Sequence, residues 1–288
     1  MKKIIITLLT VSIFGNAFSQ ETENLVYNTF HTTRIINSHS TEMLRKKTMD
    51  FRIGHRFGDI SGTNGGPSSL FGIDNSADIS IGFEYGVTNK LNIGLSRYKG
   101  AGPYRQLFEG YAKYKILSQS NKMPISLVAI TKMNITSMVA SLDSTSPTNF
   151  TTFSRRLSYS TQLIIARKFS ERFSMQLVPT YVHRNFVGAF DQNVTVAIGT
   201  GFKLQLTKLI GIIGEYHFVF TEKAVKDKMK LHNPIALGFE FNTGGHIFQM
   251  NFTNSRGFGE VQYIPTTLSD IAKGQFRFGF TISRIFKF

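Results

Sequence analysis

The sequence predicts an all-β protein, a single closed antiparallel transmembrane β-barrel of about twelve strands. Three observations lead to this prediction. Apolar and polar residues alternate with a period of two along most of the chain from residue 48 onward. The alternating segments are joined by links that are short and long in turn. Beyond residue 19, no stretch approaches the roughly twenty apolar residues that a membrane helix needs.

The final segment, residues 274–288, shows the alternation most clearly. Its apolar face consists of Phe276, Phe278, Phe280, Ile282, Phe286 and Phe288. The opposite face is largely polar, with Arg277 and Thr281 among its members. One face suits lipid and the other suits a polar lumen. The terminal Phe resembles the C-terminal signature of Gram-negative outer-membrane barrels, which implies that Phe286 and Phe288 form an assembly signal for the barrel-assembly machinery.

The remaining strands follow the same pattern. They are predicted near residues 48–57, 78–86, 91–98, 106–117, 124–137, 155–169, 173–184, 193–205, 209–219, 234–242, 246–254 and 275–288. Short links at 88–90, 118–123, 170–172, 206–208 and 242–245 are expected to be periplasmic turns. Long links at 58–76, 99–105, 138–154, 185–192, 220–233 and 255–274 are expected to be extracellular loops. Pro179 lies inside a predicted strand, so a bulge or a local distortion is expected there.

The N-terminal residues predict export. A basic start at Lys2 and Lys3 precedes a short apolar core, and small residues at Ala17 and Ser19 favour cleavage before Gln20. Residues 1–19 are therefore interpreted as a signal peptide, and the protein is expected in the outer membrane. Residues 20–47 lack a sustained period and are interpreted as a periplasmic arm, either tucked into the barrel mouth or a disordered leader. The barrel itself occupies residues 48–288.

Composition excludes several classes of protein. The chain has no Cys, which excludes a disulfide scaffold and a thiolate metal site. Its net charge of +15 is spread along strands and turns with no nucleic-acid recognition motif, so nucleic acid is not an expected partner. Outer-membrane lipid and lipopolysaccharide are the expected partners of these basic groups. The His residues show no ligand spacing, and no metal, cofactor or catalytic residue is predicted.

The polar parity of the strands predicts the residues that line the lumen. They are Asp50, Arg52, Arg56, Glu84, Glu109, Lys113, Lys115, Arg156, Lys168, Arg184, Lys203, Glu215, His217, Glu240 and Arg277. Basic groups outnumber acidic ones, which favours a narrow pore that prefers anions. The alternative interpretation is an interior salt-bridge network that fills the barrel.

Three segments carry a resemblance to a known family: residues 37–42 (Asn-Ser-His-Ser-Thr-Glu), residues 55–58 (His-Arg-Phe-Gly) and the hairpin 79–97. In these segments the chain resembles an uncharacterised family of Bacteroidota outer-membrane β-barrel proteins. The resemblance implies fold and location and carries no activity. It draws interest to Arg56, for which a contact with the barrel rim or with the arm is our hypothesis.

Three functions are compatible with the sequence. The first is a narrow channel for small, anion-leaning solutes. The second is a non-conducting structural barrel, or one that binds an envelope protein through its loops or arm. The third, a barrel-embedded hydrolase, is disfavoured because nothing around His183 and the Ser residues reproduces the context of a catalytic triad. The protein is therefore not expected to be an enzyme.

Overall fold

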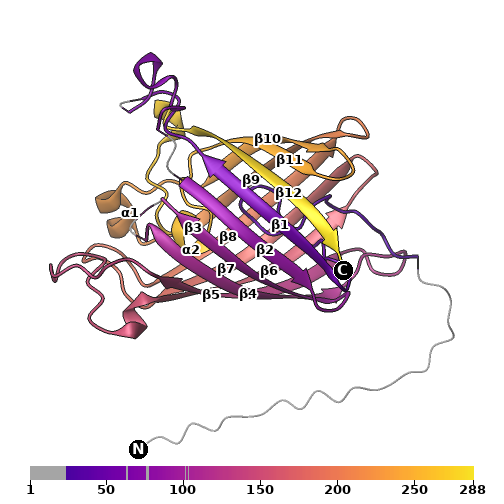
Figure 1. Ribbon diagram of the computed structural model, residues 1–288, viewed down its shortest axis with the longest axis horizontal. Coiled ribbons are helices and arrows are strands. Elements are labelled where there is room, and N and C mark those ends of the chain that lie inside the picture. Colours follow the sequence, from indigo (N-terminus) through magenta and orange to yellow (C-terminus); the bar gives the residue numbers. More distant parts are fainter. Residues whose placement is uncertain (1–23, 63, 76–77, 101, 103) are drawn as a thin grey trace, which may run out of the picture.

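The computed structural model describes residues 24–288 except 63, 76–77, 101 and 103. Within them, twelve antiparallel strands form one closed barrel in which each strand pairs with its neighbours in sequence and β1 pairs with β12 (Figure 1). The strands are β1 (Thr48–Arg56), β2 (Asp78–Gly86), β3 (Leu91–Lys99), β4 (Gln106–Leu117), β5 (Ser126–Thr136), β6 (Leu157–Lys168), β7 (Phe173–Arg184), β8 (Val194–Gln205), β9 (Ile210–Phe220), β10 (Ile235–Asn242), β11 (Ile247–Thr253) and β12 (Arg277–Lys287). The predicted fold class is confirmed.

Short helices lie only in the links of the described chain. They are η1 (Pro67–Ser69), η2 (Phe153–Arg156), α1 (Lys223–Met229), α2 (Glu260–Tyr263) and η3 (Ile271–Lys273). No helix in the described residues has the length and apolar character to cross a membrane.

The links at the two ends of the barrel differ in length, with one departure from the expected pattern. The end that carries the C-terminus, at the right of Figure 1, has the four-residue links 87–90, 169–172, 206–209 and 243–246. The opposite end carries the long links 57–77, 137–156, 221–234 and 254–276. The link 100–105 at that long-link end is nevertheless shorter than the link 118–125 at the short-link end. The prediction of strict alternation was wrong there, because the link 118–125 contains an additional turn that contacts the arm.

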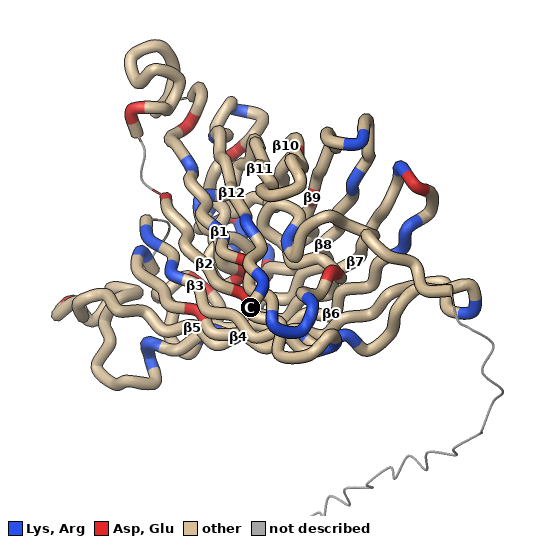
Figure 2. The backbone as a smooth tube through the Cα atoms, turned by 45° about the vertical axis from the view of Figure 1, so that its right-hand side comes forward, with Lys and Arg blue, Asp and Glu red and all other residues tan. Residues whose placement is uncertain are grey.

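The two faces of the strands divide as the period of two requires. In β2, Ile81, Phe83 and Tyr85 are exposed, whereas Ser80 and Glu84 are buried inside the ring. In a membrane barrel the exposed apolar side chains face lipid, and the pairing of every strand on both sides leaves no open sheet edge. Positions of both charge signs are distributed over the strands and the links (Figure 2).

The seam between β1 and β12 is regular. Their register runs from Thr48 opposite Lys287 to Arg56 opposite Gly279. Aromatic rings cover it on the outside, with ring centroids 5.8 Å apart between His55 and Phe280. First and last strands therefore close the ring through nine consecutive residue pairs.

Pro179 interrupts one ladder as expected. The pairing of β6 with β7 breaks between Gln162–Thr180 and Ile165–Leu177 and resumes in the same register. The missing N–H of Pro179 therefore produces a local distortion without the extra residue of a bulge.

Two segments occupy the interior of the barrel. The first is the arm, residues 24–47, which begins beside the turn 118–125, where Val26 N–H donates to Gln119 O (2.8 Å). The second, which we call the inserted loop, is residues 254–267 of the link between β11 and β12, and it carries α2. Nearly all residues from 29 to 41 and from 254 to 267 are buried. The arm enters from the short-link end and the inserted loop from the long-link end.

Candidate functional site

The arm forms a tight turn inside the lumen. Ile35 N–H donates to Ser38 O and Ser40 N–H donates to Thr33 O, both at 2.9 Å. These bonds give residues 33–40 the form of a short hairpin that pairs with itself. The turn therefore satisfies part of its own backbone and leaves other groups free to bind the wall.

Apolar contacts hold the arm against one side of the wall. Its contribution is Phe30, Ile35 and Ile36, which pack on Ala166, Ile213 and Ala236. Gly201 of β8 makes room for this contact, because a Cβ atom there would lie 2.6 Å from Ile35 Cδ1. Burying each large apolar side chain contributes on the order of 1.5–3 kcal/mol, so the docked arm is stable at rest.

Charged groups fix the arm on the opposite side. The Arg34 guanidinium donates to the Tyr98 hydroxyl (3.2 Å) and lies 3.4 Å from Glu109 Oε1. Lys113 Nζ donates to the main-chain oxygen of Glu42 at 2.6 Å. These bonds are made with little water around them, which strengthens each one and makes an unmet partner costly.

At the end of its turn the arm contacts three wall residues. Asn37 N–H lies 2.9 Å and 3.0 Å from the two carboxylate oxygens of Glu215, and Ser38 N–H lies 3.0 Å from Oε2 of the same group. The Ser38 hydroxyl lies 3.1 Å from His217 Nε2. Arg56 donates to the side-chain oxygen of Asn37. One residue, Asn37, thus links a cationic and an anionic side chain from β1 and β9.

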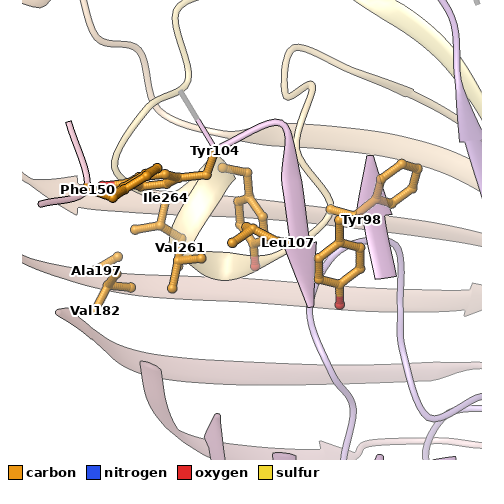
Figure 3. Close-up of a cluster of buried hydrophobic side chains, with 10 residues drawn as sticks. Tyr98, Tyr104, Leu107, Phe150, Val182, Ala197, Val261 and Ile264 are labelled. Atoms are coloured by element: carbon orange, nitrogen blue, oxygen red, sulfur yellow. The ribbon is translucent and has the colours of Figure 1, made fainter. Parts of the chain in front are cut away.

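The inserted loop is held mainly by an apolar and aromatic cluster. Val261 and Ile264 lie between the strands and the neighbouring loops, close to Val182 and Ala197 of β7 and β8 (Figure 3). The cluster also contains Tyr98, Tyr104, Leu107, Phe150, Phe258 and Tyr263. One buried ion pair joins the loop to the wall, between Glu260 and Lys132. Burial raises the pKa of the Tyr263 hydroxyl well above its ordinary value, so it stays protonated.

Arg56 joins the arm to the inserted loop. Its Nη2 donates to Asn37, while its Nη1 donates to the main-chain oxygens of Ser255 (3.3 Å), Arg256 (3.2 Å) and Gly257. Its guanidinium carbon lies 4.1 Å from the centroid of the Phe258 ring. Arg56 is 1 % exposed. The hypothesis of an arm contact through Arg56 is therefore confirmed by the structure, with a loop contact that the sequence did not indicate.

His39 is a buried titratable group of the arm. Within the described part of the chain, neither of its ring nitrogens has a hydrogen-bond partner, and its ring meets that of Tyr111 edge-on at 4.9 Å. Burial, followed by the charges of Arg34, Lys132, Lys113 and Arg52, lowers the pKa of His39 well below its ordinary value. The docked arm therefore carries a neutral His39.

Most of the predicted lumen residues do face the interior. Those with at most 8 % exposure are Asp50, Arg52, Arg56, Glu84, Glu109, Lys113, Arg184, Lys203, Glu215, His217, Glu240 and Arg277. Lys115 and Lys168 are half-buried near the short-link end. Arg156 was placed in the strand predicted at 155–169, but it lies in η2, just before β6, and donates to the main-chain oxygen of Met138 at 2.6 Å. Its predicted place in the wall was wrong, because β6 begins only at Leu157.

Several interior residues escaped the sequence prediction. Lys132 belongs to a strand for which no inward face was assigned, and Arg34, His39 and Glu260 come from segments without period. Apolar residues also face inward, and the arm residue Met43 covers part of them. This cluster contains Tyr111, Val128, Ile130, Ile164 and Val178. A rule that places polar residues inside and apolar ones outside misses such positions.

Little space remains beside the turn of the arm. The cavity bounded by Thr33, Arg34, Asp50, Arg52 and neighbouring wall residues measures about 20 Å³, roughly the room for one water molecule. Toward the short-link mouth, a cavity of about 380 Å³ opens between the arm and β1, β11 and β12. In the described structure, the arm's turn thus nearly fills the lumen, and a larger space remains between the turn and the short-link mouth. Among the described residues, no three His, Asp or Glu side chains gather as metal ligands.

Comparison with known proteins agrees with this architecture. The NanC porin superposes with a TM-score of 0.50 at 8% identity, covering 83% of this chain and 99% of that one. The KdgM porin superposes with a TM-score of 0.49 at 8% identity, covering 82% of this chain and 98% of that one. At such identities the likeness concerns the fold alone. No curated protein matches the chain. The family model for a membrane bound beta barrel domain (DUF5777) matches residues 30–286, and the chain belongs to that family.

Proposed function

We propose that the protein is an outer-membrane channel for small solutes, which the N-terminal arm holds closed at rest. The observation that carries the proposal is the construction of the lumen. The ring closes without help from the arm, since β1 pairs with β12, and the segment that fills its middle is a separate hairpin that enters from one mouth. Removal of that hairpin would leave the inserted loop as the remaining occupant of the lumen and would expose polar wall groups such as Arg52, Lys113 and Glu240 beside it, the kind of lining that water and small solutes require.

The arm is held by contacts that favour a closed resting state. Three apolar side chains and the charged contacts of Arg34 and Lys113 must be given up before it leaves. A hydrogen bond exchanged for one to water costs only about 1 kcal/mol net, so the polar part is easily replaced. The apolar part is the larger cost. Opening therefore requires a solute or partner that favours the released arm.

The proposal extends to location and orientation. We place the barrel in the outer membrane of a Bacteroidota bacterium, with the short-link end and the arm in the periplasm and the long links at the cell surface. Export would depend on the signal peptide 1–19, which is not among the described residues. The C-terminal strand with Phe286 and Phe288 would engage the assembly machinery, and lipopolysaccharide would meet the basic long links. No enzymatic activity forms part of the proposal.

The proposed channel function includes a preference for anions over cations. In the middle of the wall the cations have anionic neighbours, as in Lys203 with Glu240 (2.8 Å) and Lys113 with Glu84 (3.7 Å). Near the short-link mouth, Lys168 is paired with Glu171 (2.8 Å), so the half-buried Lys115 is the cation there that would attract anions. The reversal potential under a salt gradient measures this preference.

The test is to unseat the arm without shortening the chain. Replacing Phe30 and Ile35 by Asp puts two charges into the apolar contact, which such a contact does not tolerate. Tyr27→Asp, on an arm residue that is 70% exposed, is the matched control. In planar bilayers we expect rare openings from the wild type and from Tyr27→Asp, and sustained conductance from the double variant. Silence of the double variant, with its arm shown by labelling to be released, would refute the channel.

A second function has its own support. A filled lumen also suits a non-conducting barrel that binds an envelope protein, and the arm offers Leu25 and Tyr27 as exposed apolar residues at its start. The conductance experiment separates the two functions, since the scaffold stays silent whatever the position of the arm.

A further inference from the structure

Glu215 differs from the other buried carboxylates of the wall. Glu240, Glu84 and Glu109 each lie within 4 Å of a wall lysine. In the described residues, the hydrogen bonds to the Glu215 carboxylate come only from the backbone of the arm, at Asn37 and Ser38. Glu215 is 4% exposed, so it needs such donors whenever it is ionised. The arm therefore supplies Glu215 with hydrogen bonds that none of the described wall residues makes to it.

Arg56 presents the complementary charge to the same place. Its Nη1 is engaged by the inserted loop, while its Nη2 donates to the Asn37 side chain. His217 adds a third group: its Nε2 shares a hydrogen bond with the Ser38 hydroxyl, and its Nδ1 has no hydrogen-bond partner among the residues that the structure describes. Withdrawal of the arm would leave one guanidinium nitrogen, one carboxylate and one imidazole directed at a common point.

The spacing of these groups defines what fits. Asn37 alone reaches from Arg56 to Glu215, offering an oxygen to one and an N–H to the other. The two wall charges therefore lie one residue apart across the lumen. A free α-amino acid carries an anionic oxygen and a cationic nitrogen over a comparable span, and a dipeptide carries the same two charges one residue further apart. An anion or a cation alone would satisfy only one of the two wall charges.

We propose that the arm's turn occupies a binding site for small zwitterions of the amino-acid and short-peptide class, formed by Arg56, Glu215 and His217. Asn37 and Ser38 act as a tethered occupant of this site. A zwitterion that takes their place removes the polar contacts at the end of the arm and favours its release. The inference rests on the proposed channel only for transport, since binding at the site and release of the arm do not require conduction.

The experiment follows the arm with a single-cysteine reporter. The chain has no Cys, and Thr41 on the arm is 1% exposed, so Thr41→Cys reacts with a water-soluble maleimide only when the arm leaves. The reporter protein in detergent is labelled with and without glycylglycine. N-acetylglycine supplies the anion alone, glycinamide the cation alone, and glycerol neither charge.

We expect glycylglycine to raise the labelling rate roughly tenfold, the effect of about 1.4 kcal/mol of differential binding, and the other solutes to change it less than twofold. Glu215→Gln should remove the effect of glycylglycine. The matched control is Glu240→Gln, a second buried carboxylate that contacts the arm through His31 and lies away from the turn. It should loosen the arm and keep the response to glycylglycine.

Two results would overturn the site: an equal response to glycylglycine and glycerol, or a response that survives Glu215→Gln. Neither result bears on the channel, which stands or falls with the conductance of the unseated arm. Conversely, a selective response in a protein that never conducts would keep the site and end the channel.

Discussion

The arm and the inserted loop fill the same lumen from opposite ends by different means. The loop packs Val261, Ile264 and their aromatic neighbours into a cluster of ten buried side chains and adds one buried ion pair. The arm buries Phe30, Ile35 and Ile36 in one smaller cluster and Leu44 apart from it, and its turn rests on hydrogen bonds to charged wall groups. Apolar burial has no replacement in water, whereas hydrogen bonds do. The comparison teaches that the loop is a fixed part of the barrel and the arm its exchangeable part.

The largest effect is expected where the two segments meet. Arg56→Met removes a buried guanidinium and leaves three carbonyls and one amide oxygen without a donor, at about 1–3 kcal/mol for each unmet group. We expect a loss of about 5 kcal/mol in unfolding free energy and faster labelling of Thr41→Cys. The exposed Arg167→Met is the control. A release of the arm with the loop still resistant to protease would show that Arg56 serves the arm alone.

A smaller effect, confined to the loop, is expected from Val261→Asp. This residue is fully buried in the apolar cluster, so an Asp there is left without a partner, at a cost of about 4 kcal/mol. Limited proteolysis should then cut residues 254–267. Leu268→Asp, on an exposed neighbour, should leave the loop resistant. If labelling of the arm reporter rises as much as cleavage of the loop, the two segments form one unit and the contrast between them fails.

Phe30→Ala tests the arm alone. Truncation of a buried Phe costs about 3 kcal/mol, and this Phe belongs to the apolar cluster between the arm and the wall. Labelling of Thr41→Cys should accelerate on the order of a hundredfold, with the loop unaffected. Val139→Ala, on a highly exposed side chain of the link between β5 and β6, is the control. An unchanged labelling rate would mean that the polar contacts, and not the apolar ones, determine docking.

The smallest effect concerns pH. Because burial lowers the pKa of docked His39, the released arm binds a proton more readily than the docked one. Docking is therefore fully stable above the ordinary pKa of about 6.5 and weakens as pH falls below it. The cations Arg34, Arg52, Lys113 and Lys132 around the site oppose protonation in the docked state.

From pH 7 to 5.5, labelling of the arm reporter, divided at each pH by the labelling rate of a fully exposed Cys because only the thiolate reacts, should rise by up to roughly tenfold. His39→Gln, which cannot take up a proton, should flatten this profile. A profile that stays steep in His39→Gln would assign the pH response to another group of the lumen.

The barrel was predictable from the sequence and the contents of its lumen were not. Alternation is a local property, so Glu215 and His217 on β9 or Glu84 on β2 could be assigned to the inner face from their neighbours alone. The arm lacks any period, and its partners lie far away in sequence, as with Asn37 and Glu215. Ile130 and Ile164 face inward because the interior is occupied by protein instead of water. Which segments fill the lumen is determined by their packing against the wall, and this packing could not be predicted from the local pattern of the sequence.

The seam between β1 and β12 has a consequence for biogenesis. β1, which directly follows the arm, pairs with β12, the last strand of the barrel, joining Thr48 to Lys287. Until β12 takes its place, the sheet stays open along this side. Pairing over such a sequence distance is an intrinsically late event in folding. The arm can therefore enter the lumen from the open side of the sheet before the ring closes. After closure it can leave and re-enter the lumen only through the short-link mouth.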